Sequence, residues 1–177
     1  MTSIHVRRYA SLLLFGLAGL GLVGFGLTGC GDATTDPDAS APQAAPADPD
    51  AMTLLDGGSV TMAELEGRWV FVNYWAEWCA PCREEIPELN ELQAEHADDV
   101  FVLGVNFDQL PPEVMGPQAE RLGIRFAVAE EDPRDLLGIT LPEVLPSTYV
   151  FDPSGRQVGV LLGPQNLDQL RAAMAEG

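Results

Sequence analysis

The chain has 177 residues, with 27 acidic and 9 basic side chains and a formal net charge of −18 at pH 7. Such an acidic chain repels phosphate groups, which excludes a nucleic-acid-binding function. Residues 52–177 have the length of one ordinary domain, so a single folded unit is expected after the N-terminal region.

Residues 1–29 are expected to be a signal peptide. They contain no acidic residue, Arg7 and Arg8 form a positive start, and residues 11–27 are an apolar run rich in glycine. This run is too short and too glycine-rich for a typical transmembrane helix. An uncleaved N-terminal anchor is the alternative, and both interpretations place the domain outside the cytoplasm, on a membrane.

Residues 27–30, Leu-Thr-Gly-Cys, resemble a bacterial lipobox, in which the signal is cut before the cysteine and the thiol carries a diacylglycerol. Lipidation of Cys30 also explains the odd number of cysteines, because it leaves Cys79 and Cys82 as a pair. Several acyl chains on one cysteine give stable anchoring in a bilayer. The rest of residues 30–51 is rich in Ala, Pro and Asp and predicts a disordered, acidic tether.

The domain is organised around a strand and a helix that carry the cysteine pair. A short strand and a capped turn at residues 60–67 precede the apolar, β-branched run 70–74, which predicts a buried strand. Helical spacing follows, and cysteines three apart at a helix start can bridge. Cys79 would lie where free N–H groups and the helix dipole stabilise a thiolate, whereas Cys82 would lie on the shielded inward side. This asymmetry favours disulfide exchange, in which one thiol attacks and the other resolves.

Two other uses of a cysteine pair are a zinc site and a structural disulfide. A zinc site needs four ligands, and the pair supplies two, with Cys30 far upstream and His96 the only histidine outside the N-terminal segment. A purely structural bridge over so short a loop would add little stability. The pattern therefore predicts a redox dithiol, with no metal and no cofactor.

The remaining elements alternate in a way typical of an α/β domain. A continuous apolar run at residues 100–107 predicts a central parallel strand, and the cysteine helix supplies a right-handed crossover to it. The elements expected after it are a helix at 111–122, a short strand at 125–129, a helical turn at 133–137, strands at 147–151 and 157–162 joined by a hairpin turn at 152–155, and an amphipathic helix at 167–174.

Residues 75–83, Trp-Ala-Glu-Trp-Cys-Ala-Pro-Cys-Arg, resemble the active site of the thioredoxin superfamily. The flanking residues 73–76 and 83–89 are similar to those of its membrane-tethered TlpA/ResA branch, and the resemblance covers residues 54–175. It implies an α/β thioredoxin fold in residues 52–177, with a mixed central sheet flanked by helices. The extra helix and strand before residue 137 would be the central insertion of the TlpA/ResA branch.

The resemblance also implies a set of residues around the dithiol. Pro146 is expected to be cis and to lie against the disulfide, where the backbone of its neighbour pairs with an incoming chain. Trp75 is expected in the core and Trp78 on the rim of the site. The other supporting residues are those between the cysteines, Ala80 and Pro81.

The proton acceptor for Cys82 has no obvious candidate in the sequence. Asn73 stands where many thioredoxins keep a buried carboxylate, and an amide cannot titrate. Glu77 and Glu143 are the candidates, each with a solvated surface carboxylate as the alternative. Glu143 is favoured because its loop should face the disulfide.

The predicted function is an extracytoplasmic, membrane-anchored thiol–disulfide oxidoreductase that reduces disulfides of exported proteins. Ala80-Pro81 resembles the dipeptide of reducing members, and the histidine of DsbA-type oxidants is absent. The resemblance implies protein disulfide substrates and a membrane electron donor of the DsbD/CcdA type, with cytochrome c biogenesis as one process served. The alternatives are a disulfide oxidant or isomerase, and a binding or metallochaperone module like the Sco proteins.

Overall fold

The computed structural model of the chain describes residues 48–175. The signal segment, Cys30 and most of the tether lie outside the described residues, so the interpretation of residues 1–47 stays a prediction. Within the described part, no helix is long and apolar enough to cross a membrane. The expected domain start at Met52 falls inside β1 (Ala51–Thr53), which pairs antiparallel with β2 (Ser59–Thr61).

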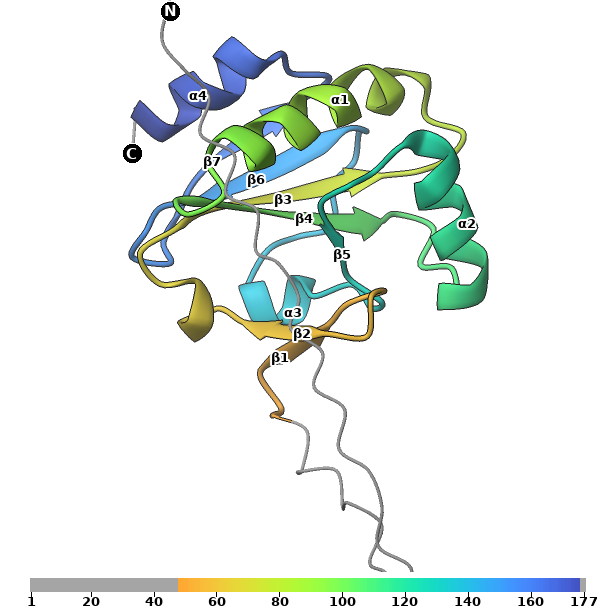
Figure 1. The fold of residues 1–177 in the computed structure, drawn as a ribbon, viewed down its shortest axis with the longest axis horizontal. Coiled ribbons are helices and arrows are strands. Elements are labelled where there is room, and N and C mark those ends of the chain that lie inside the picture. Colours follow the sequence, from red (N-terminus) through yellow and green to blue (C-terminus); the bar gives the residue numbers. More distant parts are fainter. Residues whose placement is uncertain (1–47, 176–177) are drawn as a thin grey trace, which may run out of the picture. The chain divides into compact units, whose positions relative to one another are not determined.

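Among the described residues, five strands form one mixed sheet in the order β5-β4-β3-β6-β7 (Figure 1). The central strand β3 (Trp69–Trp75) runs parallel to β4 (Val100–Asn106) and antiparallel to β6 (Ser147–Phe151). The edges are β7 (Gln157–Leu162) and the two-residue β5 (Ala127–Val128). The sheet confirms the predicted α/β class, and the continuous apolar runs in β3 and β4 match strands that are covered on both faces.

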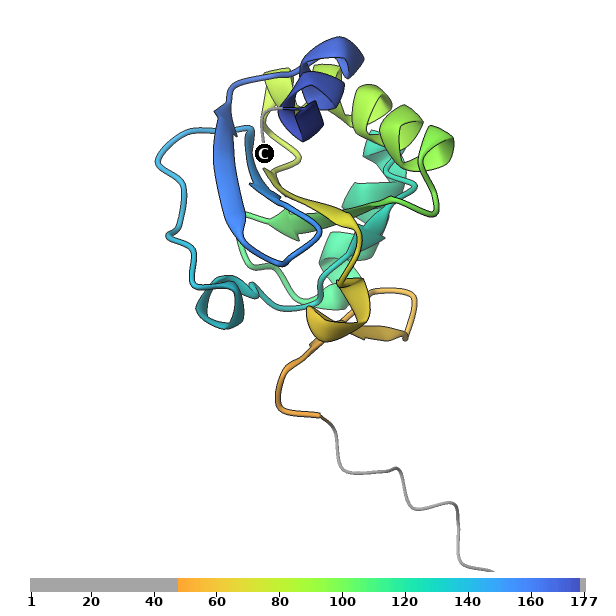
Figure 2. The same ribbon diagram turned by 90° about the vertical axis from the view of Figure 1, so that its left-hand side faces the viewer.

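Helices cover the two faces of the sheet unequally. On one face, α1 (Ala80–Glu95) and α4 (Leu167–Ala175) lie side by side (Figures 1 and 2). The other face is covered by α3 (Arg134–Leu137) and by the β1–β2 hairpin with its short helix η1 (Ala63–Leu65) (Figure 1). The helix of the insertion, α2 (Pro112–Leu122), packs beside the start of α1.

Alternate residues of β3 point into two hydrophobic cores, as the two-residue period of a strand requires. Val72 and Tyr74 pack with the β1–β2 side, whereas Phe71 packs with Ile86 and Leu89 of α1. All five side chains are almost completely buried. The start of α1 is therefore held on the end of a strand that is buried from both sides.

The strand expected at residues 125–129 is shorter in the structure, and Asn90 of α1 explains why. Its Nδ2 donates to the Gly123 carbonyl at 2.8 Å, and its Oδ1 accepts from the Arg125 N–H at 2.8 Å. These backbone groups are satisfied by a helix side chain, so pairing with β4 begins only at Ala127.

Gly104 in β4 leaves room for two aromatic side chains that pack against its backbone. A Cβ atom placed there would lie 3.0 Å from Trp75 Nε1 and 3.0 Å from Phe126 Cε2. Aromatic rings from β3 and from the β5 side thus occupy the space that a side chain would need. The glycine in this strand marks a close packing contact.

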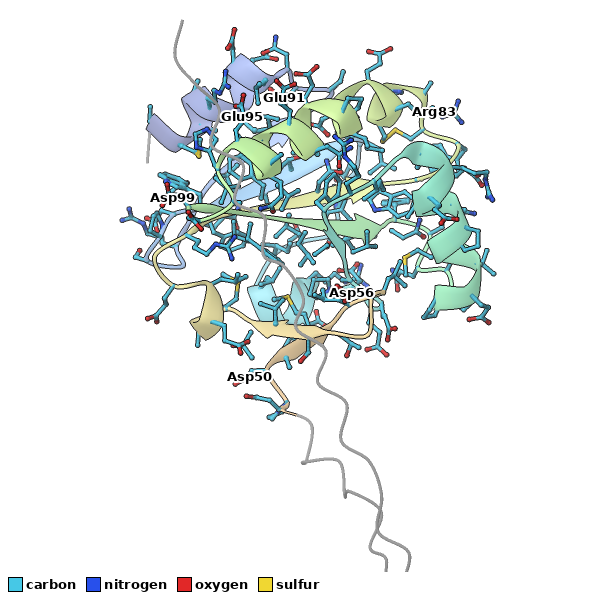
Figure 3. The ribbon with its side chains drawn as sticks, viewed as in Figure 1. Asp50, Asp56, Arg83, Glu91, Glu95 and Asp99 are labelled. Carbon is cyan, nitrogen blue, oxygen red and sulfur yellow. A yellow bond between two sulfur atoms is a disulfide. The ribbon has the colours of Figure 1, made fainter. Side chains whose placement is uncertain are left out.

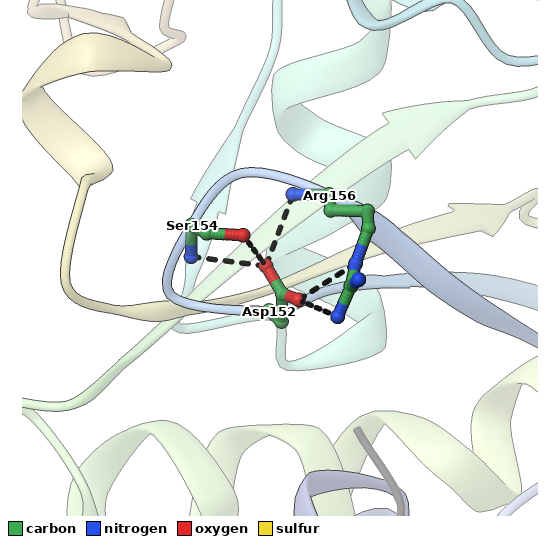
Figure 4. Close-up of polar contacts among 3 residues, drawn as sticks. All are labelled: Asp152, Ser154 and Arg156. Carbon is green, nitrogen blue, oxygen red and sulfur yellow. Dashed lines mark hydrogen bonds and ion pairs between the residues drawn. The ribbon is translucent and has the colours of Figure 1, made fainter.

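Asp152 closes the hairpin between β6 and β7, which was expected as a turn at residues 152–155. Its carboxylate accepts from the Ser154 hydroxyl at 2.6 Å and from the Arg156 guanidinium at 2.8 Å (Figure 4). These contacts lower the pKa of Asp152 to about 2, with the Ser154 hydrogen bond as the largest cause. The hairpin holds β6 in place, and β6 begins directly after Pro146.

Candidate active site

Cys79 and Cys82 are joined by a disulfide at the N-terminal end of α1, directly beyond the end of β3 (Figure 3). Cys79 is the N-cap residue, and its Sγ accepts a hydrogen bond from the Cys82 N–H at 3.2 Å. Pro81 lies in the first turn, where a missing N–H removes no helix hydrogen bond. An N-terminal N–H is therefore directed at the first sulfur, which favours a thiolate there once the pair is reduced.

The expected contrast in exposure between the two cysteines is absent from this oxidised form. Cys79 is 3% exposed and Cys82 is 1% exposed. Both pack with Met115 and Ala119 of α2, so the inserted helix covers the pair from the side. The difference between the two sulfurs therefore lies in their positions on the helix and in the hydrogen bond to Cys79, because their exposures are nearly equal.

The two tryptophans take the expected places. Trp75 is completely buried, whereas Trp78 is 63% exposed on the rim of the site. Trp78 Nε1 donates to Asp108 Oδ2 at 2.9 Å, and its ring meets Phe107 edge to face at 6.4 Å between centroids. The loop after β4 therefore holds the rim tryptophan in a defined orientation.

The loop before β6 forms the other side of the site. The Leu145–Pro146 peptide bond is cis, as expected. The Ser147 hydroxyl donates to the Val144 carbonyl at 2.9 Å, which holds the turn of this loop. A cavity of about 590 Å³ separates the loop from the rim, lined by Trp78, Cys79, Ala80, Pro81, Phe107, Glu143, Val144 and Leu145.

Neither of the two expected proton acceptors lies in a buried position. Glu77 Oε1 forms an ion pair with Arg121 at 2.7 Å, and the hydrogen bond from this guanidinium lowers the pKa of Glu77. Arg83 donates to the backbone carbonyl oxygen of Glu77 at 2.6 Å, which ties the helix start to the same residue. Glu143 lines the cavity, as expected from its loop, but its side chain is exposed to solvent. Glu77 is thus held as a carboxylate, and Glu143 is a surface group.

The buried carboxyl group of the site is Glu85, which is not among the residues expected from the sequence. Glu85 is 1% exposed, and its Oε2 accepts from Asn73 Nδ2 at 2.7 Å. The same Asn73 amide donates to Thr148 Oγ1 at 2.9 Å, and the Gln165 N–H lies 3.3 Å from Glu85 Oε1. Burial raises the pKa of Glu85 to about 7, and these hydrogen bonds act in the opposite direction.

The position of Glu85 in the helix was a usable signal. It lies three residues after Cys82, and residues three apart share a helix face. It also stands directly before Ile86, one of the buried apolar residues of α1. A carboxylate inside this inward stripe, opposite an amide at Asn73 that can donate to it, indicates a buried acid.

The sequence matches the AhpC/TSA family over residues 37–157. The chain belongs to the AhpC/TSA family. Similar members include ResA thiol–disulfide oxidoreductases of Bacillus thuringiensis (strain Al Hakam) and Geobacillus kaustophilus (strain HTA426). Each is 29% identical over 120 residues, which cover 67% of this chain and 69% and 68% of the two relatives.

Solved structures show the same fold for this AhpC/TSA family member. A DsbF homologue of Corynebacterium diphtheriae has a TM-score of 0.61 at 26% identity and covers 70% of this chain and 80% of its own. A thiol:disulfide interchange protein of Chlorobium tepidum TLS also has a TM-score of 0.61 at 26% identity and covers 71% of this chain and 90% of its own. StoA of Bacillus subtilis, at 19% identity, has a TM-score of 0.58 over 70% of this chain and 93% of its own.

These comparisons confirm the predicted thioredoxin-like fold and the similarity to ResA proteins. The AhpC/TSA family member carries its disulfide at the start of a helix that follows the central strand. It is a thiol–disulfide oxidoreductase with a thioredoxin-like fold.

Proposed function

We propose that this protein is a membrane-anchored, extracytoplasmic reductase of disulfides in exported proteins. The observation that carries the proposal is a Cys79–Cys82 disulfide at a helix N-terminus with a buried carboxyl group, Glu85, one turn further along the same helix. The catalytic pair is Cys79 and Cys82. Trp78, Ala80, Pro81 and Pro146 shape the surface around it.

The reaction begins with the reduced pair. The Cys79 thiolate attacks one sulfur of a client disulfide, that disulfide breaks, and the released client thiolate takes up a proton. The Cys82 thiol then loses its proton, and its thiolate attacks Cys79 Sγ in the mixed disulfide. The bond between Cys79 and the client breaks, the second client sulfur leaves as a thiolate that takes up a proton, and the Cys79–Cys82 disulfide forms. Two electrons have passed from the enzyme to the client, and of the two protons that the client thiols take up, one is balanced by the proton lost from Cys82 and the other comes from solvent.

Glu85 is the proposed acceptor for the Cys82 proton. A general base works best when its pKa is near the working pH, and burial raises the pKa of Glu85 to about 7. Asn73 supports this role, since it cannot titrate itself but donates to Glu85 Oε2. Glu77 is less suited because its ion pair with Arg121 lowers its pKa.

The direction of electron flow is inferred from what surrounds Cys79. A site becomes oxidising when its reduced form is stabilised, mainly through the first thiolate. Of the residues between 48 and 175 that line the cavity at Cys79, none is cationic, and Pro81 offers no N–H. Arg83 and Arg121 contact Glu77 instead. The Cys79 thiolate is therefore only moderately stabilised, which favours a reductase.

Membrane anchoring rests on the sequence. The proposal keeps residues 1–29 as a lipoprotein signal peptide, residues 30–51 as the lipidated cysteine with its tether, and residues 52–177 as the thioredoxin-like domain. Cys30 would place the domain on the periplasmic side of a bacterial membrane, within reach of an electron donor of the DsbD/CcdA type. The names of the ResA relatives support the oxidoreductase class of this proposal.

Equilibration with glutathione tests the direction. We expect a midpoint potential below about −180 mV, the value of protein disulfide isomerase. A more positive midpoint would make the protein an oxidant or isomerase. The roles of the two cysteines are tested by trapping, because Cys82→Ser should accumulate mixed disulfides with clients, whereas Cys79→Ser should form none. Equal trapping by both variants would contradict the assignment.

A further inference from the structure

The cavity beside the disulfide has apolar walls that are open to solvent. On one side stands Trp78, which is 63% exposed, packed against Phe107, and on the other stands Val144, which is 50% exposed. Cys79 and Leu145 line the space between them. Its volume of about 590 Å³ is that of a small-molecule pocket, so it admits a few side chains of an extended segment and no folded domain.

The charged groups at this cavity are acidic. Glu143 is its only charged lining residue among those described. Asp108, another acidic group nearby, accepts a hydrogen bond from Trp78. Within residues 48–175, Glu143 forms no ion pair. The carboxylate charge of Glu143 is thus directed to solvent beside the disulfide.

Glu77, the acidic residue just before the cysteine pair, differs from Glu143 because it has a cationic partner. Glu77 is neutralised by Arg121 and is further held by Arg83, and these three residues line a separate pocket with Leu122. Figure 3 shows Arg83 at this end of α1, while Glu91, Glu95 and Asp99 lie at other parts of the surface. Cations are available near the site, yet they are placed away from Glu143.

We propose that this cavity selects cationic client segments. The occupant is an extended stretch of an exported protein, with an apolar side chain against Trp78 and Val144 and a Lys or Arg next to its disulfide cysteine that pairs with Glu143. The inference rests on the proposed reductase function and adds the charge of its substrate. A second copy of this chain does not fit, because its net charge of −18 opposes self-docking.

Three disulfide-linked peptide dimers test the proposal. Each has the sequence Ac-Leu-X-Cys-Ala-amide, with X as Lys, Gln or Glu. The full chain, reduced and in micelles of a neutral detergent, is mixed with each dimer, and the single-turnover rate constant is measured after acid quenching. Each rate constant is divided by that of the same protein variant with hydroxyethyl disulfide, which carries no charge.

A partly exposed ion pair should favour the Lys dimer over the Gln dimer by about twofold to fivefold, and the Glu dimer should be slowest. The ratio of Lys to Glu rates should fall toward one in Glu143→Gln and in 0.5 M salt. Glu66→Gln removes the same charge from an exposed position near η1 and should keep the wild-type ratio.

Two results would overturn the inference: equal rates for the three dimers with the wild type, or an unchanged Lys-to-Glu ratio in Glu143→Gln. A failure to reduce any dimer and hydroxyethyl disulfide as well would remove the proposed reductase function, and the inference with it. A preference for Lys combined with a midpoint above about −180 mV would keep the cation selectivity and correct only the direction of electron flow.

Discussion

Replacing Glu85 by Gln should remove a pH dependence of folding stability between about pH 4.5 and pH 7. Burial raises the pKa of this carboxyl group from 4.5 to about 7, so in this range the folded protein holds a proton that the unfolded chain has released. The unfolded state then binds fewer protons than the folded state, and the free energy of unfolding falls as the pH rises. The contribution of the protonated group is complete below pH 4.5 and lost above pH 7.

The magnitude follows from the size of the pKa shift. The difference between 7 and 4.5 is about 2.5 pH units, and at 1.36 kcal/mol for each unit the loss of stability is about 3 kcal/mol. Gln can still accept from Asn73 Nδ2, so the contact at 2.7 Å is retained. The weaker contact with the Gln165 N–H is lost, but this effect is the same at every pH. Asp152, with its pKa lowered to about 2, loses its contribution below this range.

Urea unfolding of the oxidised protein at pH 4.5, 5.5, 6.5 and 7.5 measures this effect. The difference between wild type and Glu85→Gln isolates the one group, because the other titrating residues are common to both. Glu84→Gln is the matched control, since it removes a neighbouring exposed carboxylate and should keep the wild-type slope. Parallel curves for wild type and Glu85→Gln would mean that Glu85 is ionised at neutral pH in both states, and the argument for its role as proton acceptor would be refuted.

Three further changes test other parts of the molecule. Cys30→Ala should yield unlipidated precursor, whereas the wild-type protein should begin at a lipidated Cys30 in mass spectrometry; an unmodified Cys30 thiol in membrane-extracted protein would contradict the anchor. Gly104→Ala should destabilise the domain by about 1–3 kcal/mol in urea unfolding, because the added methyl group meets two aromatic rings at 3.0 Å; unchanged stability would show that the rings can move. Arg121→Gln should leave the Glu77 charge unbalanced two residues before Cys79 and raise the thiol pKa of Cys79, measured by the pH profile of alkylation, by less than about one unit for a surface pair. The added change Glu77→Gln should restore the profile, and identical profiles in all three proteins would show that this ion pair does not reach the thiol.

Much of the fold could be predicted from the sequence because its signals are local. The strands at residues 147–151 and 157–162 have the predicted bounds, and the central strands differ from prediction by one or two residues. An apolar run covered on both faces shows its character within a few neighbouring residues. The cysteine pair is local for the same reason, since two residues three apart at a helix start must lie within one turn of each other.

The site around the cysteines was decided by contacts between residues far apart in the chain. Glu85 is buried because Asn73 of β3 and the Gln165 backbone, 80 residues away, converge on it. Glu77 is less suited as the base because Arg121, 44 residues later, reaches it from the inserted helix and lowers its pKa. A local sequence pattern does not show which residues far apart in the chain will contact Glu85 and Glu77.

The sequence by itself determined that a dithiol stands at the start of a helix after a buried strand, because residue type and spacing suffice for that. Only the tertiary structure decided how open each thiol is, how far the pKa of the buried carboxyl group shifts and which side of the site carries unpaired negative charge. Exposure, pKa and surface charge depend on what packs against a group. At this site those partners come from the inserted helix, from the loop before Pro146 and from β6.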